Sequence, residues 1–374
     1  MLLVTNIFPP QIGGPASFID RLGHALAQDG HRVTVVCASD RTTDAGDAAR
    51  PFVVRRVPRG GRVKFEASLR ATLALEMARH QAVLVNGLEH QAAQAARFVG
   101  RRYVLKIVGD TVWETARNLG LTTRSIDDFQ TTPAPAELRI LAGRRERYLA
   151  SADVVVTPSE YLRRMVIGWG MPAERVHTVL NGVEPVAGAA PRRRPGDGLR
   201  VLFIGRLTNW KGVETLLLAL RDLPRVRATI VGDGPELPLL AALADQCLVA
   251  ERVDFRGRLS ERDTAAATAE HDVLVLGSSY EGLSHTLLEA SAHALACVAS
   301  DCGGNREVVD GRTTGLLFPY GDVARLRDAL DQLQRDEDRR LELAAGALAN
   351  AARFTFDATV HGTAALLARA SVRA

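Results

Sequence analysis

Short apolar runs alternate with amphipathic stretches of helical length through the first 157 residues of the chain. The apolar runs lie at residues 2–6, 32–37, 82–86, 103–108 and 153–157. This alternation is typical of βαβ units, in which parallel strands are joined by helices that cover both faces of the sheet. It predicts an α/β fold with a parallel sheet.

The same alternation restarts at residue 199, with predicted strands at 199–204, 227–231, 254–255, 272–276 and 296–299. A length of 374 residues exceeds what one ordinary hydrophobic core organises, which favours two doubly wound, Rossmann-like domains in tandem. We place the first domain at 1–182, a linker rich in Pro, Gly and Arg at 183–198, and the second domain at 199–354. A hydrophilic helix is expected at about 323–354, and a C-terminal helix at 355–374 is expected to pack on the first domain.

The composition excludes several classes of function. A net charge of +4 is too small to indicate a nucleic-acid partner, and no nucleic-acid-binding signature is present. The four cysteines are scattered, which suits a reducing compartment. No apolar run reaches the roughly 18 residues that a membrane span requires, and the first residues lack the basic region of a signal peptide. We therefore expect a cytoplasmic protein.

One cluster of basic residues stands out in the first domain, and Phe65 follows it. Its members are Arg55, Arg56, Arg59, Arg62 and Lys64. One interpretation is a solvated loop. The other is a contact with an anion, either lipid headgroups at the inner face of a membrane or the phosphate of an acceptor.

Arg206 and Lys211 follow the predicted strand at 199–204. Ligands of open parallel sheets bind at the carboxyl ends of the strands. A sugar diphosphate gains negative charge as its glycosidic bond breaks, so two fixed cations stabilise the transition state more than the ground state. Arg forks onto two oxygens, whereas Lys acts as a compact charge. Taken alone, the two cations are more typical of an ordinary surface loop, and only Glu281 and Glu289 downstream favour the site.

Glu281 and Glu289 are eight positions apart, downstream of the predicted strand at 272–276. A carboxylate accepts hydrogen bonds from neighbouring hydroxyls, so the pair suits a hexose and a ribose. The backbone between them forms a helix N-terminus, which attracts anions. The helix around Glu289 looks largely buried, and a buried carboxylate requires a partner. These features favour a nucleotide-sugar site.

The first domain offers weaker signals. Gly13 and Gly14 allow the backbone to approach a phosphate, but no G-x-G-x-x-G fingerprint of a nicotinamide or flavin site is present. Asp110 ends a predicted strand and has two interpretations. It contacts the sugar or acceptor, or acts as a base, or it caps the helix that follows. Lys106 is a candidate ion partner for Asp110.

Together these motifs resemble the family-4 retaining glycosyltransferases, whose GT-B fold consists of two Rossmann-like domains facing a cleft. The resemblance covers nearly the whole chain. The matching pieces are Gly13-Gly14, Pro158-Ser159-Glu160, Asn181-Gly182-Val183, Gly205-Arg206-Leu207 with Lys211-Gly212, Gly232-Asp233-Gly234-Pro235, and Glu281 to Glu289 with Gly303-Gly304.

The resemblance implies a role for each site residue. Arg206 and Lys211 would hold the donor diphosphate, Glu281 the donor sugar and Glu289 the ribose. Sugar and phosphates would be supported by the backbone of Gly282, Leu283, Ser284, His285 and Thr286. Gly14 would lie near the diphosphate, and Arg258 and Leu259 would flank the base. No metal and no cofactor are implied beyond the nucleotide sugar.

Two positions depart from the family pattern. Many relatives carry a His where this chain has Gly109, so its contact is lost or transferred to Asp110. His285 stands where Asn is frequent. The glycosidase arrangement of a carboxylate nucleophile beside an acid is not evident. The resemblance implies instead that the leaving phosphate helps to deprotonate the acceptor.

The sequence therefore predicts a hexosyltransferase that uses a UDP- or GDP-sugar and retains the anomeric configuration. Its acceptor would be a glycan, a lipid-linked molecule or a small molecule, in cell-surface glycan, polysaccharide or secondary-metabolite biosynthesis. One alternative is a GT-B-fold nucleotide-sugar epimerase or hydrolase, which acceptor-independent release of nucleotide would reveal. Another is a binding protein without catalysis, against which the complete set of charged residues argues.

Overall fold

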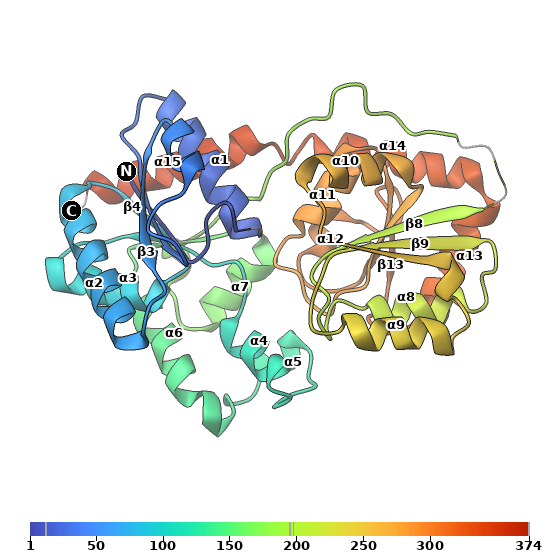
Figure 1. Ribbon diagram of the computed structural model, residues 1–374, viewed down its shortest axis with the longest axis horizontal. Helices are drawn as coiled ribbons and strands as arrows, with labels where there is room; N and C mark the ends of the chain where they lie inside the picture. Colours follow the sequence, from blue (N-terminus) through green and yellow to red (C-terminus); the bar gives the residue numbers. More distant parts are fainter. Residues whose placement is uncertain (12, 194–195, 197, 373–374) are drawn as a thin grey trace. The chain divides into compact units, whose positions relative to one another are not determined.

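The computed structural model describes residues 1–11, 13–193, 196 and 198–372. Within these residues the chain forms two compact units, each with its own parallel sheet (Figure 1). The first unit comprises Met1–Leu121, Pro133–Leu180 and the chain from Asp357 onward. The second comprises Thr122–Thr132 and Asn181–Phe356. The α/β class and the GT-B type of architecture predicted from the sequence are confirmed.

Among the described residues the first sheet has seven strands in the order β3-β2-β1-β4-β5-β6-β7, and every pair is parallel. They are β1 (Leu2–Thr5), β2 (Thr34–Ser39), β3 (Val53–Pro58), β4 (Val83–Asn86), β5 (Val104–Lys106), β6 (Val154–Thr157) and β7 (Val176–Thr178). β1, β4 and β6 are buried along their whole length, as their continuous Val and Leu runs require.

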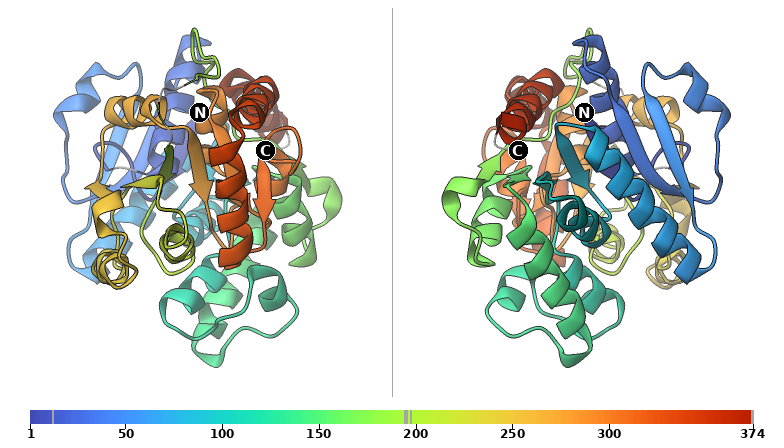
Figure 2. Two further views of the ribbon diagram at one scale, coloured as in Figure 1. Left: turned by 90° about the vertical axis from the view of Figure 1, so that its right-hand side faces the viewer. Right: turned by 90° about the vertical axis from the view of Figure 1, so that its left-hand side faces the viewer.

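Helices cover this sheet. They are α1 (Gly14–Gln28), α2 (Arg62–Arg79), α3 (Glu89–Val99), α4 (Thr111–Asn118), α6 (Arg139–Ser151), α7 (Glu160–Gly168) and α15 (Phe356–Val372). Figure 2, in its right-hand view, shows α2, α3 and α6 side by side, and they share one apolar core with β1, β4 and β5. The C-terminal helix α15 is tied to the first unit, because Thr359 Oγ1 donates a hydrogen bond to the carbonyl oxygen of Leu180 at 2.8 Å.

The second sheet has six parallel strands within the described residues, in the order β10-β9-β8-β11-β12-β13. They are β8 (Leu199–Ile204), β9 (Val226–Val231), β10 (Val253–Gly257), β11 (Val273–Leu276), β12 (Ala296–Ser300) and β13 (Leu316–Phe318). The helices of this unit are α5 (Ile126–Gln130), α8 (Val213–Leu220), α9 (Leu237–Gln246), α10 (Glu261–Glu270), α11 (His285–Ala292), α12 (Asn305–Val308), α13 (Val323–Arg335) and α14 (Glu337–Ala351).

The structure departs from the sequence expectation in several places. β3 replaces the predicted basic loop around Arg55 and Arg56. The single helix expected at about 323–354 is two helices, because Asp336 leaves the helical conformation and its side chain caps α14 by accepting the backbone N–H of Arg339 at 2.8 Å. Part of the predicted linker, Arg194, Pro195 and Asp197, lies outside the described residues.

The strand order reverses at β1 and β4 in the first sheet and at β8 and β11 in the second. Adjacent crossovers diverge at such a point, which leaves a crevice beyond the carboxyl ends of the strands. This is where candidate ligand-binding residues of each unit belong.

Candidate active site

The candidate residues of the second unit lie in the loops at the carboxyl edge of its sheet. Arg206 and Lys211 occupy the loop between β8 and α8. Glu281 precedes α11, and Glu289 lies inside it. Arg258 and Leu259 follow β10. The parallel sheet thus gathers at one edge residues that are far apart in the sequence.

Lys211 and Glu281 form the central contact of this edge. Lys211 Nζ lies 2.6 Å from Glu281 Oε1, and the hydroxyl of Ser278 donates to the same oxygen at 2.6 Å. Both charged side chains are mostly buried, with 21% and 15% of their surface exposed. Opposite charges in contact offset part of the desolvation that burial costs each of them. The two groups are therefore held in one fixed arrangement, and sequence reasoning had not identified Ser278 as its third member.

Glycines bring these loops together at backbone distance. A Cβ on Gly212 would stand 2.0 Å from the carbonyl oxygen of Gly277, and Gly212 has a φ of +72°. Ser279 N donates to Trp210 O at 2.7 Å beside this contact. Gly212 therefore has no room for a side chain larger than hydrogen, and the loop that carries Lys211 packs directly against the loop after β11.

A second glycine contact fixes the backbone of Glu281. Gly304 N donates to the carbonyl oxygen of Glu281 at 2.8 Å. A Cβ on Gly304 would stand 2.1 Å from the carbonyl oxygen of Gly282. The Gly303-Gly304 pair after β12 therefore packs directly against the segment that carries Glu281.

The segment 282–286 leads into the N-terminus of α11. Ser284 is the N-cap, and its hydroxyl accepts the backbone N–H of Leu287 at 3.2 Å. Asn181 Nδ2 donates to the carbonyl oxygen of Leu283 at 3.3 Å. The positive end of the helix dipole is thereby presented beside Lys211 and Glu281, which suits an anion.

Glu289 is exposed, and the sequence expectation of a buried carboxylate was wrong. The inward face of α11 carries Leu287, Leu288 and Ser291. Glu289 lies one turn after His285, on the partly exposed face that begins at the N-terminus of the helix. Arg206 is also exposed. Both side chains are accessible to a ligand at this edge.

The loops after β9 and β10 are joined at the far side of the same edge. Gly232 N donates to Gly257 O at 2.7 Å. Arg258 Nε lies 3.4 Å from Asp233 Oδ2, and both side chains are largely exposed. Leu259 is half-buried. An exposed ion pair of this kind contributes little to stability, so its groups are available for a ligand.

In the first unit, Asp110 is the N-cap of α4. Its Oδ1 accepts the backbone N–H of Val112 at 3.0 Å, and it accepts from Arg145 Nη1 at 2.8 Å. The carboxylate is completely buried. Asp110 thus pairs with Arg145, which the sequence had not indicated. Lys106 Nζ lies 4.0 Å from the ring centroid of Phe18, and burial lowers the pKa of Lys106 to about 7.

Gly14 is the first residue of α1 and is exposed. Gly13 precedes it, and its carbonyl oxygen accepts the N–H groups of Ala16 and Ser17 at 3.0 and 3.1 Å. Within the described residues, no side chain caps the N-terminus of α1, which follows β1 in the chain.

The basic cluster is not a solvated loop. Arg56 is buried on β3 and donates two hydrogen bonds to Asp47, each 2.7 Å long, which lower the pKa of that carboxyl. Arg62 and Lys64 are exposed in the first turn of α2, on either side of Val63, which is 85% exposed. Of the five cations, Arg56 therefore has no surface to offer an anion.

Other features of the described residues bear on function. No group of three or more His, Cys, Asp or Glu side chains is arranged for a metal ion there. In the same part of the chain, no helix combines the length and apolar character that crossing a membrane demands. A cavity lined by Ala189, His271, His293 and Arg340, among others, lies at the amino edge of the second sheet, away from the candidate residues.

Comparison with known proteins connects both units to one group of enzymes. Residues 12–186 match the family described as Glycosyltransferase Family 4, and residues 189–349 match Glycosyl transferases group 1. A GDP-mannose-dependent alpha-(1-6)-phosphatidylinositol monomannoside mannosyltransferase of Mycobacterium tuberculosis is 29% identical over 92% of this chain and 91% of its own. A D-inositol 3-phosphate glycosyltransferase of Xylanimonas cellulosilytica is 32% identical over 64% of this chain and 63% of its own.

Solved structures share the fold. Sucrose-phosphate synthase of Thermosynechococcus elongatus superposes with a TM-score of 0.80 at 20% identity, covering 100% of this chain and 99% of the other. HepE of Anabaena, solved in complex with UDP-glucose, gives a TM-score of 0.77 at 20% identity, with 99% and 100% covered.

We predict that Gly212→Ala destabilises the second unit more than Gly257→Ala does. Both glycines have positive φ, at +72° and +63°, but a Cβ on Gly257 meets nothing within 4 Å. The φ cost alone is about 1–2 kcal/mol, and forced overpacking adds about 1–3 kcal/mol at Gly212. Chemical denaturation measures both variants, and equal losses of unfolding free energy would show that the loop contact is not tight.

Proposed function

Because this chain belongs to the family-4 glycosyltransferases with the GT-B fold, we propose that it transfers a hexose from a nucleotide diphosphate sugar to an acceptor hydroxyl, with retention of the anomeric configuration. The observation that carries the proposal is the Lys211–Glu281 pair at 2.6 Å, which joins the loop that also contains Arg206 to the segment that leads into α11. Cations and a helix N-terminus suit a diphosphate, and a carboxylate suits the sugar.

Each candidate site residue has one role. Arg206 and Lys211 stabilise the charge that develops on the leaving diphosphate. Glu281 holds the donor sugar, and the backbone of 282–286 supports sugar and phosphates. Glu289 binds the ribose, while Arg258 and Leu259 flank the base. In the first unit, Gly14 provides a backbone contact for the diphosphate, and buried Asp110 orients Arg145 and α4.

The names of the relatives guide the choice of substrates. The mycobacterial relative uses GDP-mannose, so GDP-mannose is the first donor to try. Its acceptor and that of the Xylanimonas relative both contain an inositol phosphate group. The first unit carries 25 Lys and Arg against 16 Asp and Glu, whereas the second carries 22 against 27. A positive acceptor-side unit suits an anionic acceptor of this kind.

Arg206→Ala and Lys211→Ala are each expected to lower turnover about 100- to 1,000-fold, since losing one electrostatic donor to a developing oxyanion costs about 3–4 kcal/mol. Steady-state rates with GDP-mannose and UDP-glucose measure the effect. Arg262→Ala, an exposed cation on α10, is the control and should leave the rate unchanged. Near-normal turnover in both site variants would refute the assignment.

The product should keep the anomeric configuration of the donor. Its anomeric proton coupling constant, measured by NMR after transfer to an inositol-containing acceptor, identifies the configuration directly. An inverted linkage would contradict the proposed mechanism.

We also propose that the reaction requires no metal ion, since two cations already serve the diphosphate. Turnover should therefore persist in excess EDTA. Loss of activity that magnesium or manganese restores would disprove this part of the proposal.

The exposed first turn of α2 is proposed to contact anionic lipid headgroups through Arg62 and Lys64, with Val63 between them. Each cation near an anionic surface contributes about 1 kcal/mol. Reversing both charges, Arg62→Glu with Lys64→Glu, should reduce cosedimentation with phosphatidylinositol vesicles more than 10-fold at low salt. Arg55→Glu on β3 is the control. Equal vesicle binding by the double variant and the unaltered protein would rule the contact out. So would equal binding of the unaltered protein to phosphatidylinositol vesicles and to neutral vesicles.

A further inference from the structure

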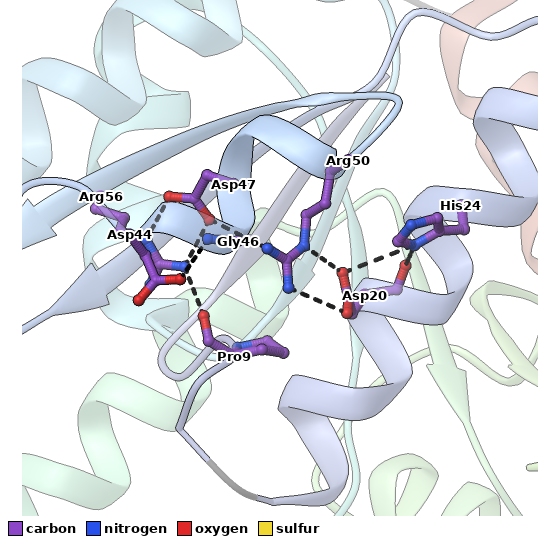
Figure 3. Close-up of polar contacts among 8 residues, drawn as sticks. All are labelled: Pro9, Asp20, His24, Asp44, Gly46, Asp47, Arg50 and Arg56. Carbon is purple, nitrogen blue, oxygen red and sulfur yellow. Dashed lines mark hydrogen bonds and ion pairs between the residues drawn. The ribbon is translucent and has the colours of Figure 1, made fainter.

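Arg56 is a buried cation that ties three parts of the first unit together. Its side chain is 1% exposed. Nε and Nη2 each donate to one carboxylate oxygen of Asp47 at 2.7 Å, and Nη2 also donates to the carbonyl oxygen of Pro9 at 2.5 Å (Figure 3). β3 is thereby joined both to the short helix Ala45–Ala49 and to the loop between β1 and α1.

Arg50 continues this network to α1. Its Nε donates to Asp20 Oδ1 at 2.7 Å and its Nη1 to Asp47 Oδ1 at 3.3 Å (Figure 3). Both guanidinium groups lie near the ring of buried Phe8, with centroid distances of 4.9 Å for Arg50 and 5.6 Å for Arg56. Phe8 belongs to the same loop as Pro9, so the network contacts this loop at the Phe8 ring as well as at the Pro9 carbonyl oxygen.

A third cation holds the start of the loop. Arg59 Nη2 donates to the carbonyl oxygen of Asn6 at 2.7 Å and to its side-chain oxygen at 3.1 Å. The carbonyl groups of Asn6 and Pro9 are thus both fixed by residues that follow β2 in the chain. This loop ends at Gly13 and Gly14, which open α1.

We propose that Arg56 is a positioning residue that fixes the β1–α1 loop, and through it the Gly13-Gly14 backbone, for the leaving diphosphate. The inference rests on the proposed function, in which Gly14 contacts that group. A buried guanidinium carries a large desolvation cost, which its pairing with Asp47 offsets. The additional bond to Pro9 serves the loop, since Asp47 already occupies both Nε and Nη2. Displacing a reacting group by about 1 Å costs about 100-fold in rate.

The first measurement is hydrogen–deuterium exchange of peptides that cover residues 6–11. Arg56→Gln should exchange faster there than the unaltered protein. Arg55→Gln is the matched control, because Arg55 is the neighbouring residue of β3 and its side chain is 56% exposed, with Nε 3.7 Å from Glu76 Oε1. Unchanged exchange in Arg56→Gln overturns the inference whether or not the protein is a transferase.

The second measurement separates positioning from simple loss of structure. GDP and UDP titrations give the fraction of molecules that bind nucleotide, and steady-state kinetics gives kcat per binding molecule. Arg56→Gln should keep full binding stoichiometry while kcat falls about 10- to 100-fold. Arg56→Lys keeps the charge but cannot donate two parallel hydrogen bonds to one carboxylate, so it should lose less kcat than Arg56→Gln.

The outcomes are distinguishable. Faster exchange with normal kcat per binding molecule, or a kcat loss matched by an equal loss of binding-competent molecules, overturns the positioning role. Absence of transfer by the unaltered protein with any nucleotide sugar refutes the proposed function. In that case the exchange of residues 6–11 still decides whether Arg56 holds the loop.

Discussion

The candidate site depends on backbone contacts that only glycine permits. Gly212 meets Gly277, and Gly304 meets Gly282, at separations where a methyl group would overlap a carbonyl oxygen. These contacts bind the loops after β8, β11 and β12 into one surface. That surface holds the backbones of Lys211 and Glu281 at positions from which their side chains meet at 2.6 Å. A preorganised electrostatic site of this kind needs little rearrangement when charge develops on a ligand.

Charge is used differently in the two units. At the second sheet, the charges of Lys211 and Glu281 offset each other, while Arg206 is exposed. In the first unit, Arg56 and Arg145 pair with the carboxylates of Asp47 and Asp110, and these pairs hold a loop and a helix start in place. Some of the cations of that unit therefore stabilise its interior contacts, whereas others, including Arg62 and Lys64 on α2, are exposed.

Residues of one type with similar spacing in the sequence have unlike roles in the structure. The cluster from Arg55 to Lys64 looked uniform, yet Arg55 is exposed, Arg56 is buried and Arg62 lies on a helix. The sequence concealed β3 because its run Val-Val-Arg-Arg-Val-Pro lacks the continuous apolar character of the inner strands. Edge strands tolerate such residues, and the carboxylate that makes Arg56 compatible with burial is nine positions away. Similarly, Glu289 looked buried because its neighbours are apolar, although the helix turns it outward.

The sequence alone indicated the α/β class and the tandem of two units, because continuous apolar strands and glycine-rich turns are local patterns that the backbone enforces. The family was indicated by the resemblance of its motifs. It also placed Arg206, Lys211 and Glu281 at strand ends. Only the tertiary structure decided which of these groups touch, that Ser278 joins Glu281, that Arg145 pairs with Asp110, and that Arg56 reaches Pro9. Such contacts join residues 3 to 70 positions apart. They depend on sheet order and loop packing, which no local pattern encodes.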